Sequence, residues 1–180
     1  MRKVLMILVA GVLLGMLSAC NNSSDGESSS GGGGGAAPYP VTLGAFKDFS
    51  CTSNWTNRDS ALGLKAYSGS GTCKASFPGV SGKYRMTVTV QTEFDGRPFY
   101  NVSINGAVVN SGTYPVSSSL GCDCPKDWRT VCPDIDVDFD GGVQQVNTGD
   151  VIQFYGKEQF ACSGNGAYAK WHRIAFTPVK

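Results

Sequence analysis

Short runs of alternating apolar and polar residues dominate residues 38–180, and this two-residue period restricts the chain to β-strands. The clearest run is "KYRMTVTVQT" at residues 83–92. In "FYNVSINGAVV", Asn105-Gly106 separates two such runs and is the strongest two-residue hairpin signal. "DVIQFYG" and "AKWHRIAFTP" continue the pattern, with Trp171 placed on the face opposite Ile174 and Phe176. We therefore predict an all-β fold of two packed antiparallel sheets, each with one buried and one wet face.

The first 20 residues have the order of an export signal. Arg2 and Lys3 precede the apolar run Val4 to Leu17, which is shorter than the roughly 20 residues of a spanning helix. The run ends in "LSAC" and resembles a bacterial lipoprotein signal, although an ordinary signal peptide with a chance cysteine is the alternative. The resemblance implies that residues 1–19 are removed and that Cys20 carries palmitate and anchors the protein to a membrane. Asn21, in place of an aspartate, implies the outer membrane of the cell envelope.

Residues 20–37 are rich in serine and glycine and contain no large apolar side chain, so we expect a flexible linker there. Residues 38–180 then suit a single domain, which we expect to act as a monomer. The chain has 15 Lys and Arg residues against 14 Asp and Glu residues. This balance provides no basic field for nucleic acid, so nucleic-acid binding is not expected.

Seven cysteines are present, and six remain if Cys20 carries lipid. In an exported chain an even number predicts three disulfides, although 15 pairings are possible. Zinc binding by the cluster "CDCPKDWRTVC" is the alternative, but the spacing matches no common zinc motif. The pairings we prefer are Cys51 with Cys73, Cys124 with Cys132, and Cys122 with Cys162.

The stretch "CPDIDVDFDGG" places an aspartate at every second position from 134 to 140. A strand with Ile135, Val137 and Phe139 facing the core is the leading interpretation, and the aspartates then form a solvated acidic face. Calcium is the alternative, because Asp136, Asp138 and Asp140 with the following glycine match the opening of a calcium loop. The match breaks at the twelfth position, where Asn147 replaces the usual glutamate. No other cofactor is expected.

Three segments together resemble a jelly-roll carbohydrate-binding module. They are "SGKYRMTVTVQTEFDGRPFYNVSINGAVV", "VNTGDVIQF" and "YAKWHRIAFTP". The cysteine-rich insert from Gly121 to Cys132 has no counterpart in that pattern. The resemblance implies a jelly-roll sandwich and a polysaccharide ligand, but it supplies no ligand residues.

The candidate ligand residues therefore follow from the chemistry of sugar binding alone. A sugar-binding surface needs flat aromatic rings and planar polar groups, and the strand parity of Trp171 makes it the first candidate. The further candidates are Tyr168, Asn165, Arg97, Trp55 and Trp128. The loop "EFDGRPF" that contains Arg97 is otherwise a solvated turn with a local ion pair.

Three function classes remain open: a membrane-anchored polysaccharide-binding module, an envelope lipoprotein without a small ligand, and, least favoured, a glycan-active enzyme. A glycosidase needs two carboxyl groups, one of them with a pKa raised by burial. A wet row of aspartates does not provide that environment. We therefore predict a binding protein, not an enzyme.

Overall fold

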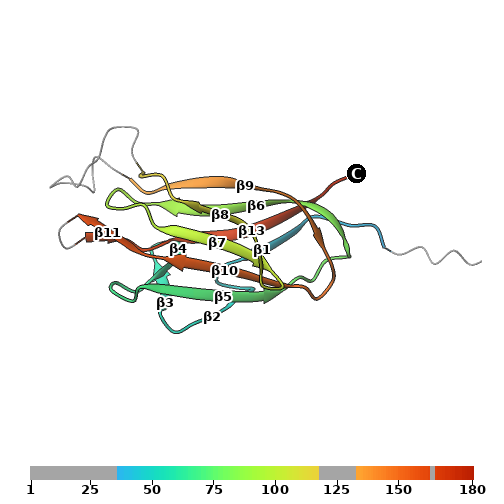
Figure 1. Ribbon diagram of the computed structural model, residues 1–180, viewed down its shortest axis with the longest axis horizontal. Coiled ribbons are helices and arrows are strands. Elements are labelled where there is room, and N and C mark those ends of the chain that lie inside the picture. Colours follow the sequence, from blue (N-terminus) through green and yellow to red (C-terminus); the bar gives the residue numbers. More distant parts are fainter. Residues whose placement is uncertain (1–35, 118–132, 163–164) are drawn as a thin grey trace, which may run out of the picture. The chain divides into compact units, whose positions relative to one another are not determined.

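The computed structural model describes residues 36–117, 133–162 and 165–180 (Figure 1). The expected signal and linker with Cys20, and also Cys122, Cys124, Cys132 and Trp128, lie outside these residues. In the described residues the elements are strands, and they form two antiparallel sheets and a two-stranded hairpin. The predicted all-β sandwich is confirmed. No described helix has the length and apolar character needed to cross a bilayer.

The first sheet has the strand order β3-β4-β13-β6-β9, and β1 also pairs with β13. Its strands are β1 (Val41–Gly44), β3 (Trp55–Arg58), β4 (Ala61–Leu64), β6 (Gly82–Thr92), β9 (Ile135–Val146) and β13 (Trp171–Pro178). The alternation that predicted β6 matches its burial as far as Val88, since Tyr84, Met86 and Val88 are fully buried. Beyond that point burial no longer alternates, because residues 88–92 are all buried.

The second sheet has the order β2-β5-β10-β7-β8. Its strands are β2 (Ser50–Cys51), β5 (Ser70–Ser76), β7 (Phe99–Ile104), β8 (Ala107–Thr113) and β10 (Val151–Lys157). The predicted hairpin between β7 and β8 is confirmed, and Asn105 and Gly106 both have positive φ, as its turn requires. Cys51 and Cys73 are cross-strand partners in β2 and β5 and form a disulfide, which confirms that pairing.

Aromatic rings from both sheets meet in the core. Trp171 of β13 stacks on Phe154 of β10 with ring centroids 4.1 Å apart, and Trp55 and Phe49 pack edge-on against it. Trp171 and Trp55 are therefore core residues, with Trp171 fully buried. Neither offers a face to a sugar, so the proposal that Trp171 and Trp55 bind ligand is wrong.

A β-bulge explains the error in strand parity. Between Trp171 and Arg173, strand β13 advances two residues while its partner β6 advances only from Val90 to Thr89. The extra residue turns Trp171 onto the same face as Ile174, which is also fully buried. Strict alternation places the two residues on opposite faces, and no side chain in the sequence marks the bulge.

The acidic stretch forms the first half of β9, an end strand of its sheet among the described residues. Val137 and Phe139 pack against the core, as predicted, but Ile135 is 45% exposed, so its predicted burial is wrong. The strand continues through Gly141 and Gly142, with a register shift against β6. Gly142 has a φ of 71°, and glycine adopts such a positive φ at a β-bulge without steric cost.

Candidate functional site

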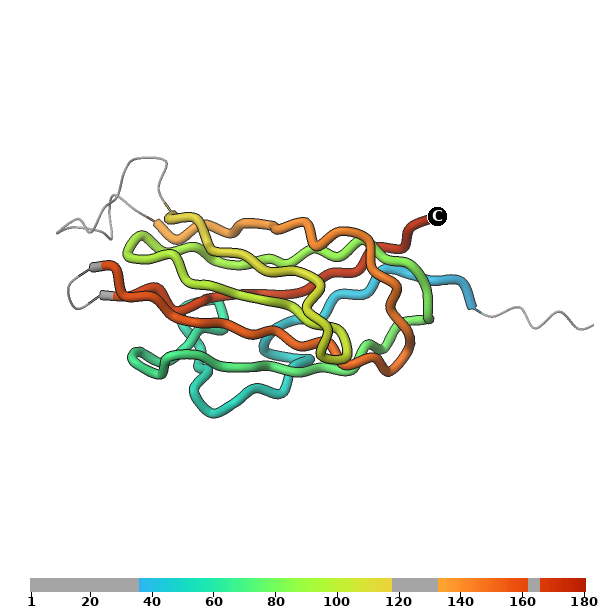
Figure 2. Tube along the Cα trace, in the orientation of Figure 1, coloured from blue at the N-terminus to red at the C-terminus, as the bar shows by residue number. Residues whose placement is uncertain are grey.

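Loops gather at one end of the sandwich, which we call the loop end (Figure 2). It comprises the turn 65–69 after β4, the loop 93–98 after β6, and the hairpin of β11 (Gln159–Cys162) and β12 (Asn165–Ala167). Backbone hydrogen bonds join these segments, since Ala161 N donates to Asp95 O and Glu158 N donates to Gly69 O. The loop end therefore brings together residues far apart in the sequence.

Three aromatic side chains form a continuous row at the loop end, and we call them the aromatic row. Tyr67 stacks on Phe160, with ring centroids 4.5 Å apart and planes within 6°. Phe160 in turn meets Tyr168 edge-on at 6.0 Å. Arg58 lies over the ring of Tyr168, 3.4 Å from its centroid. The aromatic row thus begins at the exposed ring of Tyr67 and ends at the ring of Tyr168, which the guanidinium of Arg58 covers.

Tyr67 is the most exposed large side chain of the row, at 74%. Its φ of 61° is unusual for a bulky residue, because the left-handed region crowds the side chain. Phe160 supports one face of the ring and leaves the other open to solvent. Because strained backbone conformations cluster at functional sites, this one makes Tyr67 a candidate binding residue.

Beside the row lies a depression of about 220 Å³, which we call the charged hollow. Its walls come from β3 and the turn after it, the loop after β6, the residue before β9 and the segment before β13. The lining residues are Arg58, Asp59, Glu93, Phe94, Asp95, Asp134, Tyr168 and Lys170. Tyr168 belongs to both the aromatic row and the charged hollow, so the two are continuous.

Lys170 is the centre of the ionic contacts in the charged hollow. Its Nζ lies 2.7 Å from Asp134, 3.2 Å from Glu93 and 3.4 Å from Asp59. Burial alone would lower the pKa of Lys170, but the charges of Glu93 and Asp134 outweigh it and raise that pKa. The ammonium therefore stays protonated and holds three separate segments together.

Glu93 and Asp95 are buried carboxyl groups, although the sequence suggested a solvated turn. Burial raises the pKa of Glu93 to about 7, against the opposing pull of Lys170 and of the Tyr168 N–H, which donates to Oε2 at 2.5 Å. Burial also raises the pKa of Asp95, and the charge of Asp134 adds to the increase. The predicted local ion pair of this loop is instead a long-range pair between Glu93 and Lys170.

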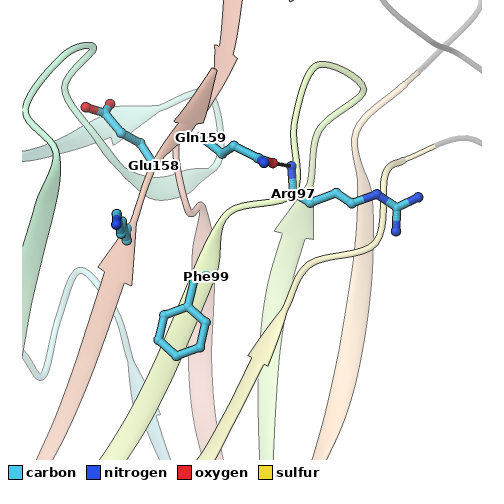
Figure 3. A pocket seen from close by; sticks show the side chains of 5 residues that line it. Arg97, Phe99, Glu158 and Gln159 are labelled. Carbon is cyan, nitrogen blue, oxygen red and sulfur yellow. Dashed lines mark hydrogen bonds between the residues drawn. The ribbon is translucent and has the colours of Figure 1, made fainter. Parts of the chain in front are cut away.

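Arg97 lies at a second hollow of about 240 Å³, lined by Arg97, Phe99, Lys157, Glu158 and Gln159. Figure 3 shows the guanidinium of Arg97 and the carboxylate of Glu158 pointing away from Phe99. Gln159 accepts a hydrogen bond from the Arg97 backbone N–H, which holds the loop in place. The charges here diverge, so this hollow is the weaker candidate.

The structure thus brings together only part of the predicted site. Tyr168 lines the charged hollow, Arg97 lies at the other hollow, and Asn165 begins β12 without its side chain being described. Sequence reasoning missed Tyr67, Phe160 and Lys170. For Tyr67 a signal existed, because an aromatic residue within the turn-forming stretch "KAYSGSG" has no strand to bury it.

The aspartates of β9 each lie close to a partner on another strand of the same sheet. Asp136 lies 3.0 Å from His172, Asp138 accepts from Thr89 at 2.5 Å, and Asp140 pairs with Arg85 at 2.7 Å. Within the described ranges, no three His, Cys, Asp or Glu side chains are grouped to hold a metal ion. The described geometry therefore gives calcium no support, and calcium binding stays a prediction for titration.

Comparisons with known proteins show the fold. No family model matches the chain, and no curated protein matches its sequence. Among solved structures, the insecticidal crystal protein Cry2Aa is similar, with a TM-score of 0.54 and 14% identity over 77% of this chain and 21% of that one. At that identity the likeness supports the sandwich fold alone.

Two other similar structures contain or are carbohydrate-binding modules. One is a GH26-CBM35 β-(1,4)-mannanase of Podospora anserina, with a TM-score of 0.49 and 17% identity over 79% of this chain and 28% of that chain. The other is a CBM35 of Paenibacillus barcinonensis, with a TM-score of 0.45 and 11% identity over 77% and 99%. Of the two, the mannanase is much longer than this chain, and the similar region is 28% of its length.

Proposed function

We propose that the domain binds a polysaccharide at its loop end, with the aromatic row as the stacking surface. The observation that carries the proposal is Tyr67, an exposed ring supported from behind by Phe160 and held in a strained backbone conformation. Aromatic faces bind the apolar faces of sugar rings, and neighbouring polar groups then bond the hydroxyls. The charged hollow supplies such groups where the row ends at Tyr168.

A glycan array and a pull-down on insoluble polysaccharides test this proposal. A lost ring stack of about 1.4 kcal/mol is worth about tenfold in affinity, so Tyr67→Ala should weaken binding by about that factor. Phe46→Ala is the matched control, because Phe46 is a 52% exposed aromatic residue outside the row. The proposal is lost if no glycan binds, or if Tyr67→Ala and Phe46→Ala bind equally well.

Binding is favoured over catalysis by the hydrogen bonds of Glu93. The buried pair Glu93 and Asp95 keeps a glycan-active enzyme as the second candidate, because a raised carboxyl pKa suits a general acid. However, Glu93 Oε1 faces the Lys170 ammonium and Oε2 accepts from the Tyr168 N–H, so both oxygens already act as acceptors. Release of reducing sugar from any polysaccharide that binds, abolished by Glu93→Gln, would favour the enzyme.

We further propose that lipid on Cys20 anchors the domain to the outer membrane, with residues 20–37 as the linker. The support is the "LSAC" order after an apolar run. Cys20→Ser should move the protein from the membrane fraction to the soluble fraction. An unchanged membrane fraction for Cys20→Ser would contradict the anchor and leave the binding proposal intact. If Cys20→Ser releases the protein from the membrane but no glycan binds to the domain, the results favour an envelope lipoprotein without a small ligand.

A further inference from the structure

The strands of the second sheet carry charge of one sign. Strands β2, β5, β7, β8 and β10 contain Lys74 and Lys157 but no aspartate and no glutamate. In the first sheet, by contrast, strand β9 alone contains three aspartates. The outer side of the second sheet therefore attracts negatively charged groups.

The burial pattern shows which side chains of this sheet face solvent. In β5 and β10 every second residue is buried, and the residues between them are half-buried or exposed. Tyr155 of β10 is half-buried, and its register partners are Thr72 of β5 and Asn101 of β7. The outer residues of β5, β10 and β7 form what we call the second-sheet face: Ser70, Thr72, Lys74, Gln153, Tyr155, Lys157, Phe99 and Asn101. An aromatic ring thus lies between a hydroxyl and an amide, which can hydrogen-bond the hydroxyls of a sugar stacked on the ring.

A second aromatic ring lies beside Tyr155 on the second-sheet face. Phe99 is 38% exposed, and its ring centroid is 6.4 Å from that of Tyr155, with the planes 62° apart. Phe99 also lines the hollow of about 240 Å³ together with Lys157. The end of the face is therefore hollowed, and a sugar ring placed against Phe99 lies near the Lys157 ammonium.

The two lysines of this face are not neutralised by the protein. Among the residues that the structure describes, neither Lys74 nor Lys157 forms an ion pair with a carboxylate. The carboxylates at the two ends of β10 accept backbone hydrogen bonds instead: Asp150 accepts from the turn before the strand, and Glu158 accepts from the Gly69 N–H. Both ammonium groups are therefore available to an anionic ligand.

We propose that the second-sheet face is a further binding surface of the domain and that it takes an acidic polysaccharide. Lys74 pairs in register with Gln153, four residues from Lys157 along β10, so the two lysines lie in rows about 13 Å apart. Tyr155 lies in the row between them. A run of sugar acids that stacks on Tyr155 therefore reaches both ammonium groups with its carboxylates. This face does not include the aromatic row, so the inference does not rest on binding at the loop end.

Calorimetry on the purified protein tests this inference with hexamers of galacturonic acid and of mannuronic acid. Each hexamer is compared with its methyl ester, which has the same rings without the charge. Two exposed ion pairs predict about fivefold tighter binding of at least one acid than of its ester at low salt. The preference should disappear at about 1 M salt, where charges are screened within about 3 Å.

Two variants of the second-sheet face locate the binding. The double variant Lys74→Gln with Lys157→Gln should remove the preference for the acid. Tyr155→Ala should weaken both the acid and the ester by about tenfold, because both lose the stacked ring. The double lysine variant changes only exposed side chains, so it tests the inference even if Tyr155→Ala fails to fold.

Two matched controls separate this face from the rest of the domain. Lys83→Gln removes an exposed lysine of the first sheet and should keep the preference, and so should Tyr67→Ala at the loop end. Equal binding of acid and ester, or a preference that survives the double lysine variant, overturns the inference.

Other outcomes would place the ligand elsewhere. If Tyr67→Ala abolishes binding of the acid and Tyr155→Ala does not, the acid binds at the loop end, which overturns this inference and supports the proposed function. If neither acid binds, the inference is lost, whatever neutral glycan binds at the loop end. Sedimentation with anionic phospholipid vesicles, without binding of either acid, also overturns it and indicates a lipid surface as the partner.

Discussion

Glu93 should make the domain less stable as the pH rises from mildly acidic to neutral. Its pKa in the folded state is raised to about 7, mainly by burial, from an ordinary value of 4.5. The folded state therefore holds a proton that the unfolded chain releases. The stabilising contribution is fully present below about pH 4.5 and is lost as the pH passes through about 7.

The size of the effect follows from linkage. Each pH unit between the two pKa values corresponds to about 1.4 kcal/mol, so the raised pKa predicts a loss of about 3 kcal/mol. Asp95 adds to the loss in the same direction, because burial raises its pKa as well. For a domain whose total stability is roughly 5–15 kcal/mol, this change is readily measured.

Urea denaturation of the wild type and Glu93→Gln, between about pH 4.5 and about pH 8, measures the prediction. Glutamine does not titrate, so the difference in unfolding free energy between the two proteins should change by about 3 kcal/mol across this range. Lys170→Gln removes the charge that opposes the shift, so its decline should extend to higher pH. Parallel curves for the wild type and Glu93→Gln would refute the raised pKa.

Three further predictions concern the core. Trp171→Ala should lower the unfolding free energy by about 3–5 kcal/mol, measured by urea denaturation, because its ring joins both sheets; a loss below about 1 kcal/mol would contradict this role. Replacing both Cys51 and Cys73 by serine should cost about 3 kcal/mol, because the bridge closes a loop with a sequence separation of 22; an unchanged denaturation midpoint would count against it. Gly71→Ala should cost about 1–3 kcal/mol, since its Cβ would meet Trp55 Nε1 at 2.3 Å, and an equally stable variant would show that the indole can move.

The fold was predictable where one local rule decides the outcome. Strand β6 follows from period-two alternation, and the β7–β8 hairpin follows from Asn105-Gly106. The face of Trp171 was not predictable, because a bulge depends on how β13 pairs with β6. The continuation of β9 past Gly141 was also not predictable, because it depends on how β9 pairs with β6 along its length.

The candidate site was less predictable than the fold, because its contacts are distant in the sequence. Nothing near Glu93 indicates that its partner is Lys170, which reaches it only when β13 lies beside β6. Tyr168 was expected as a candidate for its ring, but its role depends on Phe160 and Arg58, which come from other elements. Stacking and ion pairing of this kind follow from the topology, not from a motif.

The aspartates of β9 also bear on how copies of the protein meet one another. An end strand offers unpaired backbone groups to the same strand of a second molecule, and such contact starts sheet extension and aggregation. If two β9 strands approached antiparallel, their carboxylates would lie close to one another, and like charges opposed in this way are destabilising. Asp136 and Asp140, each more than half exposed, therefore disfavour such a contact between two β9 strands.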